Sequence, residues 1–134
     1  MITAVDSSVI IDVLEPDPEY GPASREALRH CLREGSMAAC DVVWAEVATA
    51  FGHAQAQAVA ALREIGIAYS PMTEQSALRA AEYWHRFRKR SAGKDHIVAD
   101  FLVGGHALVQ ADRLLTRDRG VYRDCFKPLK LVTP

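Results

Sequence analysis

Four acidic residues, far apart in the sequence, have surroundings that could bring them into one chemical site: Asp6, Glu46, Asp100 and Asp118. Asp6 and Asp118 each come just after a short apolar run, while Glu46 and Asp100 interrupt segments that are otherwise almost wholly apolar. Carboxylates that meet in one place repel one another and cannot all stay ionised without a cation. Because oxygen ligands without cysteine favour Mg²⁺ or Mn²⁺, the pattern predicts a metal site suited to the hydrolysis of phosphodiester bonds.

The elements that must position these acids are short apolar strands that alternate with helices. The pattern predicts strands over residues 2–5, 36–40, 67–70, 113–116 and 130–132. It predicts helices over residues 7–14, 23–34, 42–51, 54–65, 73–90 and 96–110. We expect a serine to cap the first helix, Asp41 to cap the third, and Asp95 to open the last. Alternation of this kind is typical of an α/β fold with a mainly parallel sheet.

The direction of a parallel sheet sorts the acids by position. Active sites of such sheets lie outside the carboxyl ends of the strands. Asp6 and Asp118 follow strands, so both are expected at that edge, whereas Asp112 precedes the strand 113–116 and is expected at the opposite edge. Glu46 and Asp100 lie on helices that begin near the carboxyl edge, and Asp100 is expected about one and a half turns into its helix.

The composition is that of an ordinary globular protein with 134 residues, 49% of them hydrophobic, and a net charge of −1. This length suits a single domain over residues 1–134. No apolar run is long enough to cross a bilayer, and the start "MITAVDSS" lacks the features of a signal peptide. The three cysteines are odd in number and widely spaced, so we expect reduced thiols in a cytoplasmic protein with no membrane contact.

A basic segment over residues 86–94 contains five cations and no acid: Arg86, Arg88, Lys89, Arg90 and Lys94. Such a run can be a solvated helix end, where cations also suit the helix dipole. Beside a metal site the same cations could hold the phosphates of RNA. The sequence leaves both readings open.

Several acids also have simpler explanations. Asp6 could only cap the helix 7–14, Glu46 could be a surface residue of its helix, and Asp118 could belong to a polar turn. Asp12, on the first helix, is expected to be exposed or paired.

The environment of Asp100 has its own alternatives. It could form a salt bridge with Arg113 or Lys94. Asp95, which is most simply a helix cap, is the best substitute for Asp100 as the acid of that helix.

Four segments in this order carry a resemblance that covers essentially the whole chain: "AVDSSVIIDVL", "WAEV", "ADFLVGGHAL" and "LLTRDRGVY". Together they resemble the PIN-domain ribonucleases, specifically the VapC-type toxins of toxin–antitoxin pairs. The resemblance implies a three-layer α/β/α sandwich and an endoribonuclease that depends on Mg²⁺ or Mn²⁺. It implies the catalytic and metal-binding acids Asp6, Glu46, Asp100 and Asp118. Ser8 and Thr116 fall on polar support positions, whereas Asp41 departs from the serine or threonine that is usual there.

The resemblance also implies partners. These are an RNA substrate, a small antitoxin protein encoded beside the toxin, and a second copy of the chain in a homodimer. An antitoxin arginine could enter the acidic cluster and displace the metal. Apolar residues on the helices 23–34 and 54–65 could form a groove for an amphipathic antitoxin helix.

Two other functions compete with the nuclease. The chain could be a non-catalytic regulatory or scaffold module that keeps the fold and one ion, and cleavage of single-stranded RNA would separate the two. A phosphoacceptor receiver is a weaker match, because its acceptor acid and late lysine cannot be placed.

Two further features of the segment 96–110 are expected to be structural. His106 lies off the face that carries Asp100, and a hydrogen-bonded structural role is expected. Gly104 and Gly105 are expected to let their helix lie close to the central strands.

Overall fold

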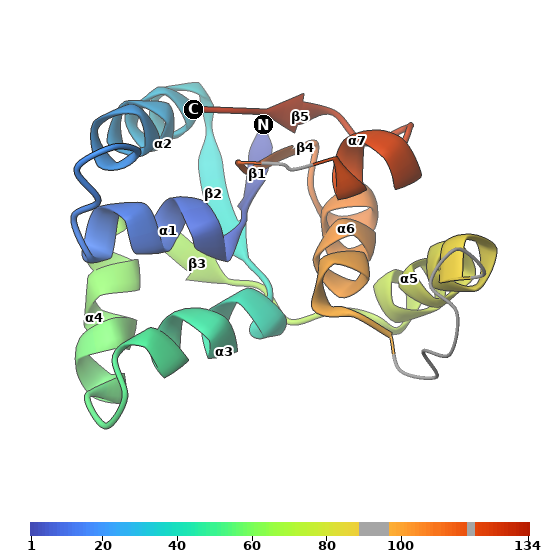
Figure 1. The fold of residues 1–134 in the computed structure, drawn as a ribbon, viewed down its shortest axis with the longest axis horizontal. Coiled ribbons are helices and arrows are strands. Elements are labelled where there is room, and N and C mark those ends of the chain that lie inside the picture. Colours follow the sequence, from blue (N-terminus) through green and yellow to red (C-terminus); the bar gives the residue numbers. More distant parts are fainter. Residues whose placement is uncertain (89–96, 118–119) are drawn as a thin grey trace.

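A five-stranded parallel sheet forms the centre of the protein (Figure 1). The computed structural model describes residues 1–88, 97–117 and 120–134. The strands are β1 (Ile2–Val5), β2 (Ser36–Ala39), β3 (Ile67–Tyr69), β4 (Arg113–Leu115) and β5 (Leu131–Val132). Their order is β3-β2-β1-β4-β5, and all four neighbouring pairs are parallel. The predicted α/β class and parallel sheet are therefore confirmed.

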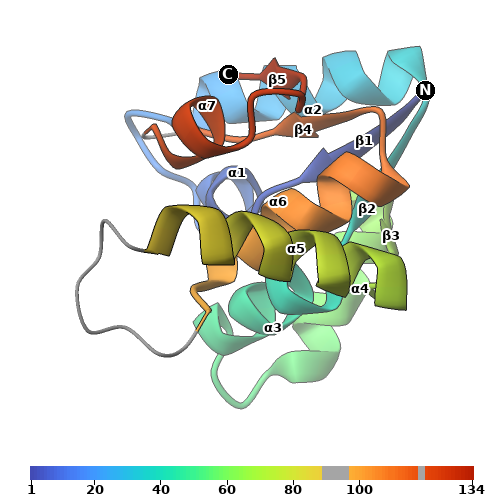
Figure 2. The same cartoon turned by 90° about the vertical axis from the view of Figure 1, so that its right-hand side faces the viewer.

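Helices cover the sheet on both sides. They are α1 (Ser7–Leu14), α2 (Gly21–Glu34), α3 (Asp41–Ala50), α4 (Gln55–Ile65), α5 (Glu74–Phe87), α6 (Ala99–Gln110) and α7 (Val121–Cys125). Figure 1 shows the strands between α1 and α2 on one side and α5 and α6 on the other. In Figure 2, α5 lies across α6 in front of the sheet. Within the described residues, no helix has the length and apolar character needed to cross a bilayer.

Most helix ends follow local chemistry, with corrections at the starts of α1 and α3. Asp6, rather than a serine, caps α1, because its carboxylate accepts a hydrogen bond from the Ser7 amide at 2.8 Å. Cys40 occupies the N-cap position of α3, so Asp41 is the first residue of that helix and not its cap. Thr73 caps α5, and Gly66 ends α4 in the left-handed conformation that favours glycine.

Close packing explains the paired glycines of α6. A Cβ atom on Gly104 would lie 2.6 Å from the Phe126 ring, and one on Gly105 would lie 2.7 Å from the Cβ atom of Ala80. The close approach that the sequence predicts is present. Its partners are α5 and Phe126, however, and not the central strands, because α6 is sandwiched between α5 and the residues after β4.

His106 lies in the interior of α6 and is almost fully buried. Its Nε2 atom is 2.9 Å from the Ser70 hydroxyl, and burial lowers the pKa of the imidazole. These observations agree with a structural role for this histidine.

Candidate functional site

Asp6 is fixed at the carboxyl end of β1. Its amide donates to the Leu115 carbonyl at 2.9 Å, which ties the end of β1 to the end of β4. One carboxylate oxygen accepts from the Ser7 amide at 2.8 Å, and the other accepts from the Thr116 hydroxyl at 2.7 Å. The carboxylate is therefore both a helix cap and an oriented acid, so the two readings of Asp6 are compatible.

Asp100 stands at the beginning of α6. The helix begins at Ala99, so Asp100 lies in its first turn and not one and a half turns inside, as the sequence led us to expect. The residue is exposed, and a negative charge at a helix N-terminus is favourable. The charge in an apolar helix therefore needs no buried partner. Arg113 is not that partner, because it binds Glu34 and Thr3.

One hollow joins the two acids. Asp6 and Asp100 line it together with Ser8, Thr116, Arg117, Val121 and Tyr122. The structure thus brings both aspartates and both predicted supporting residues to the carboxyl edge of β1 and β4. The Ser8 hydroxyl is buried and has no hydrogen-bond partner among the described residues. A buried polar atom of this kind beside two carboxylates fits a site that takes a polar or ionic ligand.

Glu46 approaches this cluster from α3. The Ser7 hydroxyl donates to its carboxylate at 3.4 Å. Although the residue is largely exposed, partial desolvation of its carboxyl group raises the pKa, and the negative charges of Asp6 and Asp100 raise it further. The three acids from β1, α3 and α6 therefore act on one another electrostatically.

Tyr122, on α7, is a member of the site that sequence reasoning missed. Its hydroxyl donates to Asp100 at 3.4 Å, and its side chain is almost fully buried. Desolvation raises the pKa of the phenol, and the nearby charges of Asp6 and Asp100 add to the effect, so the hydroxyl stays protonated as a donor. The helix α7 was also missed, because five residues are too few for a periodic pattern. The only available signal was the aromatic residue shortly after Asp118.

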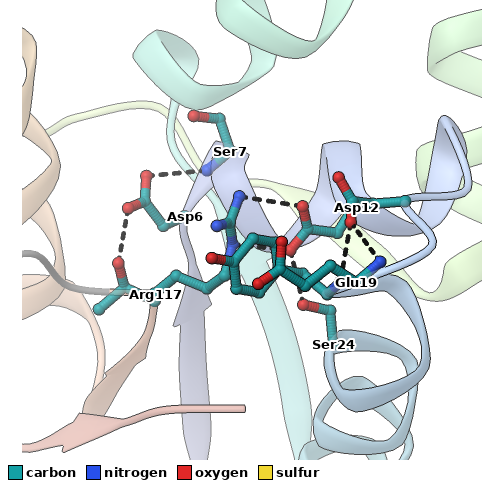
Figure 3. Close-up of polar contacts among 9 residues, drawn as sticks. Asp6, Ser7, Asp12, Glu19, Ser24 and Arg117 are labelled. Atoms are coloured by element: carbon teal, nitrogen blue, oxygen red, sulfur yellow. Dashed lines mark hydrogen bonds and ion pairs between the residues drawn. The ribbon is translucent and has the colours of Figure 1, made fainter.

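Arg117 lines the hollow, and its side chain reaches Asp12 on α1 (Figure 3). Its Nη2 atom donates to Asp12 at 3.0 Å, and its Nε atom lies 2.8 Å from the other Asp12 oxygen in a charge contact. Asp12 was expected to be exposed or paired. It is paired, and it is buried rather than exposed. Ser24, on α2, donates to the same carboxylate at 2.7 Å, and the guanidinium stacks over the Tyr20 ring at 4.1 Å.

The remaining candidates are distributed around this cluster. Asp112 accepts a hydrogen bond from the Ile2 amide at the beginning of β1, which places it at the opposite edge, as predicted. Asp41 lies near the same edge as the acids, but its carboxylate contacts the Val42 amide at 3.2 Å. Asp118 and Asp95 lie outside the described residues.

The basic segment is only partly described. Arg86 lies over the Tyr83 ring and forms an exposed ion pair with Glu82 at 3.4 Å. Arg88 is exposed at the end of α5. The other three cations fall outside the described residues: Lys89, Arg90 and Lys94.

The donor chemistry of the hollow suits a hard divalent ion. Its acids offer only oxygen atoms, which Mg²⁺ and Mn²⁺ prefer. Both aspartates also accept hydrogen bonds that orient them, a usual feature of metal ligands. Among the described residues, no three side chains of the histidine, cysteine or acidic type are grouped closely enough to hold one ion, and Asp118 is not among those residues.

Comparison with known proteins supports the same reading of the fold. The family model for the PIN domain matches residues 3–127. No curated protein sequence matches the chain significantly. Solved structures do match it.

A chain of VapBC2 from Rickettsia felis, bound to a DNA fragment from the promoter, aligns with a TM-score of 0.76 and 14% identity, over 100% of this chain and 99% of that chain. VapBC-1 from nontypeable Haemophilus influenzae aligns with a TM-score of 0.73 and 15% identity, over 99% of this chain and 98% of that chain. DNA-bound VapBC from Salmonella typhimurium aligns with a TM-score of 0.66 and 13% identity, over 99% of this chain and 98% of that chain. At these identities, the likeness shows a shared fold.

Proposed function

Because the chain belongs to the PIN domain family, we propose that it is an endoribonuclease that depends on Mg²⁺ or Mn²⁺ and acts as the toxin of a toxin–antitoxin pair. The proposed metal ligands are Asp6, Glu46, Asp100 and Asp118. The observation that carries the proposal is the hollow at the carboxyl edge of the sheet, where Asp6 and Asp100 meet from separate elements beside Ser8 and Thr116. An acidic cleft at this edge is the expected place for chemistry in a parallel sheet.

The proposed reaction is the in-line attack of water on phosphorus, with the 3′ oxygen of RNA as the leaving group. A divalent ion, when bound, supplies Lewis-acid activation of the water and stabilises negative charge on the leaving oxygen. Thr116 and Ser7 hold the Asp6 carboxylate, and Tyr122 holds that of Asp100. Glu46, which is largely exposed, is proposed to accept a proton from the attacking water.

The substrate is proposed to be RNA that reaches the site along the basic segment. Arg86 and Arg88 offer exposed cations at the end of α5. The ion pair of Arg86 with Glu82 is exposed and therefore weak, so a phosphate can replace the carboxylate. Lys89, Arg90 and Lys94 are proposed to extend this surface.

The proposed protein partner is a small antitoxin. The structural neighbours are VapBC proteins, which supports such a partner. A hollow between α1, α2 and α4 supports the predicted groove for an amphipathic helix, because its lining is mostly apolar: Val13, Leu28, Leu32, Met37 and Ile65, together with Arg25 and Arg29. Leu32 is 51% exposed there, which leaves apolar surface to be covered. A homodimer in the cytoplasm completes the proposal.

The decisive experiment incubates the purified protein with a mixed pool of single-stranded RNA in Mg²⁺, Mn²⁺ or EDTA and maps the cut ends. The proposal predicts cleavage that needs the metal and stops in EDTA. A folded protein that cuts no RNA with either metal contradicts the nuclease and favours the non-catalytic scaffold.

A further inference from the structure

The ion pair between Asp12 and Arg117 lies at the wall of the acidic hollow, and the proposed chemistry does not use it. Asp12 is only 4% exposed and Ser24 is fully buried, so the pair is held from the interior. The Arg117 side chain is 22% exposed, and it lines the same hollow as Asp6 and Asp100. A permanent cation is therefore built into a pocket of carboxylates.

A cation in this position has two competing sets of partners. The carboxylates of the hollow attract a guanidinium, because arginine forms strong, two-pronged hydrogen bonds with carboxylates. The second set of partners consists of Asp12, which makes two contacts with the Arg117 guanidinium, and the Tyr20 ring, which makes a third. These three contacts come from α1 and from Tyr20 at the start of α2. Ser24 fixes the orientation of Asp12 by a hydrogen bond of 2.7 Å.

We propose that Asp12 is a positioning residue of the nuclease site, which acts through Arg117: it holds the guanidinium on the wall of the hollow and out of the carboxylate cluster, where this cation would compete with the divalent metal. The inference rests on the proposed metal-dependent function. It gives a functional reason for a buried ion pair whose formation costs desolvation free energy, since two charges lose hydration when they are buried. Asp12 thereby serves as the counter-ion of Arg117 beside the site.

The test measures Mn²⁺ binding by isothermal titration calorimetry, on folded protein well below its melting temperature. Asp12→Asn keeps the shape of the side chain and releases the guanidinium. We expect it to weaken Mn²⁺ binding by roughly an order of magnitude, the size typical of lost support for a metal ligand. Arg117→Gln alone should leave binding unchanged or tighter. The double variant Asp12→Asn with Arg117→Gln should bind Mn²⁺ within about twofold of Arg117→Gln, because the competing cation is gone.

Thr3→Val is the matched control for simple loss of a buried polar contact. It removes a buried hydroxyl that accepts a hydrogen bond from Arg113 and touches neither Asp12 nor Arg117, so it should lower the melting temperature and leave the Mn²⁺ affinity close to that of the wild type. Thermal melts of all variants, run in EDTA, separate loss of stability from loss of metal binding.

Two results overturn the inference while the proposed function stands. One is wild-type Mn²⁺ affinity in folded Asp12→Asn, and the other is a double variant that binds as weakly as Asp12→Asn. If the wild type itself binds no Mn²⁺ and cuts no RNA, the proposed function fails, and the positioning role falls with it.

Discussion

The Thr116 hydroxyl donates a hydrogen bond of 2.7 Å to the Asp6 carboxylate, although the two residues are 110 positions apart in the sequence. The bond crosses from the end of β4 to the end of β1, the two strands that the parallel pairing places side by side. It holds one carboxylate oxygen of Asp6, the candidate metal ligand. The pairing of β1 with β4 therefore sets the orientation of this carboxylate.

Replacing Thr116 by valine should weaken metal binding. The change keeps the branched shape and removes the hydroxyl donor, so the Asp6 carboxylate loses the contact that orients it from the end of β4. We expect an increase of about tenfold in the Mn²⁺ dissociation constant, measured by calorimetry. Thr3→Val is the control: this buried hydroxyl binds Arg113 far from the acids, so its loss should affect stability alone. Equal metal affinity of Thr116→Val and the wild type would contradict the role of Thr116.

Removing one acid of the hollow should abolish RNA cleavage and leave the fold intact. Asp6→Asn and Asp100→Asn each delete a proposed metal ligand. In the absence of metal, each change also relieves repulsion among carboxylates, so the melting temperature of Asp100→Asn in EDTA should not fall. Asp6→Asn also replaces one of the two oxygens that accept hydrogen bonds from Ser7 and Thr116, so its melting temperature should be lower than that of Asp100→Asn. Asp112→Asn, at the opposite edge, should retain cleavage. Retained cleavage in both hollow variants would sink the mechanism.

Glu46 should make the metal-free protein less stable as the pH rises. The folded state raises the pKa of its carboxyl group above the ordinary value of 4.5, so the folded protein binds the proton more tightly than the unfolded chain does. Stability from this group is therefore lost as the pH rises from about 4.5 through the raised pKa, and the loss persists at neutral pH. In EDTA, Glu46→Gln should be more stable than the wild type at pH 7, with a difference that shrinks toward pH 4.

Melting curves of both proteins across this pH range provide the measurement. Glu64→Gln, on the exposed surface of α4, is the control and should follow the wild type. A stability difference between Glu46→Gln and the wild type that does not change with pH would refute the coupling.

Gly105→Ala should destabilise the fold. The added Cβ atom would lie 2.7 Å from Ala80 and 2.9 Å from the Ser76 carbonyl, so α5 and α6 must move apart. Overpacking of this kind costs about 1–3 kcal/mol, which urea unfolding measures as a lower midpoint. An unchanged midpoint would show that the helix pair adjusts without strain.

Leu32→Glu should weaken antitoxin binding and leave RNA cleavage unchanged. The side chain lines the groove between α1, α2 and α4, away from the acidic hollow, and a charge there opposes the burial of an apolar helix. We expect a loss of affinity of about tenfold or more, measured with the purified antitoxin. Leu78→Glu on α5, where Leu78 is 63% exposed, is the control. If both variants bind the antitoxin equally well, the groove is not its binding site.

The order of the five strands and of helices α1 to α6 was readable from the sequence, because the signals are local. Short apolar runs between helical segments predicted all five strands, and the direction of a parallel sheet then separated Asp6 from Asp112 without any structure. The position of an acid relative to its own strand depends only on chain order, so this sorting did not need distances.

Only the tertiary structure decided which groups meet. The bond between Thr116 and Asp6 and the contact between Tyr122 and Asp100 join residues from separate elements, and no local pattern encodes the distance between them. The start of α6 was also misjudged, because apolar side chains before Ala99 look the same in a helix and in a packed connection. Asp12 is the clearest case: helical periodicity places it on α1, but its burial and its pairing with Arg117 arise only when α2 and the end of β4 close around it.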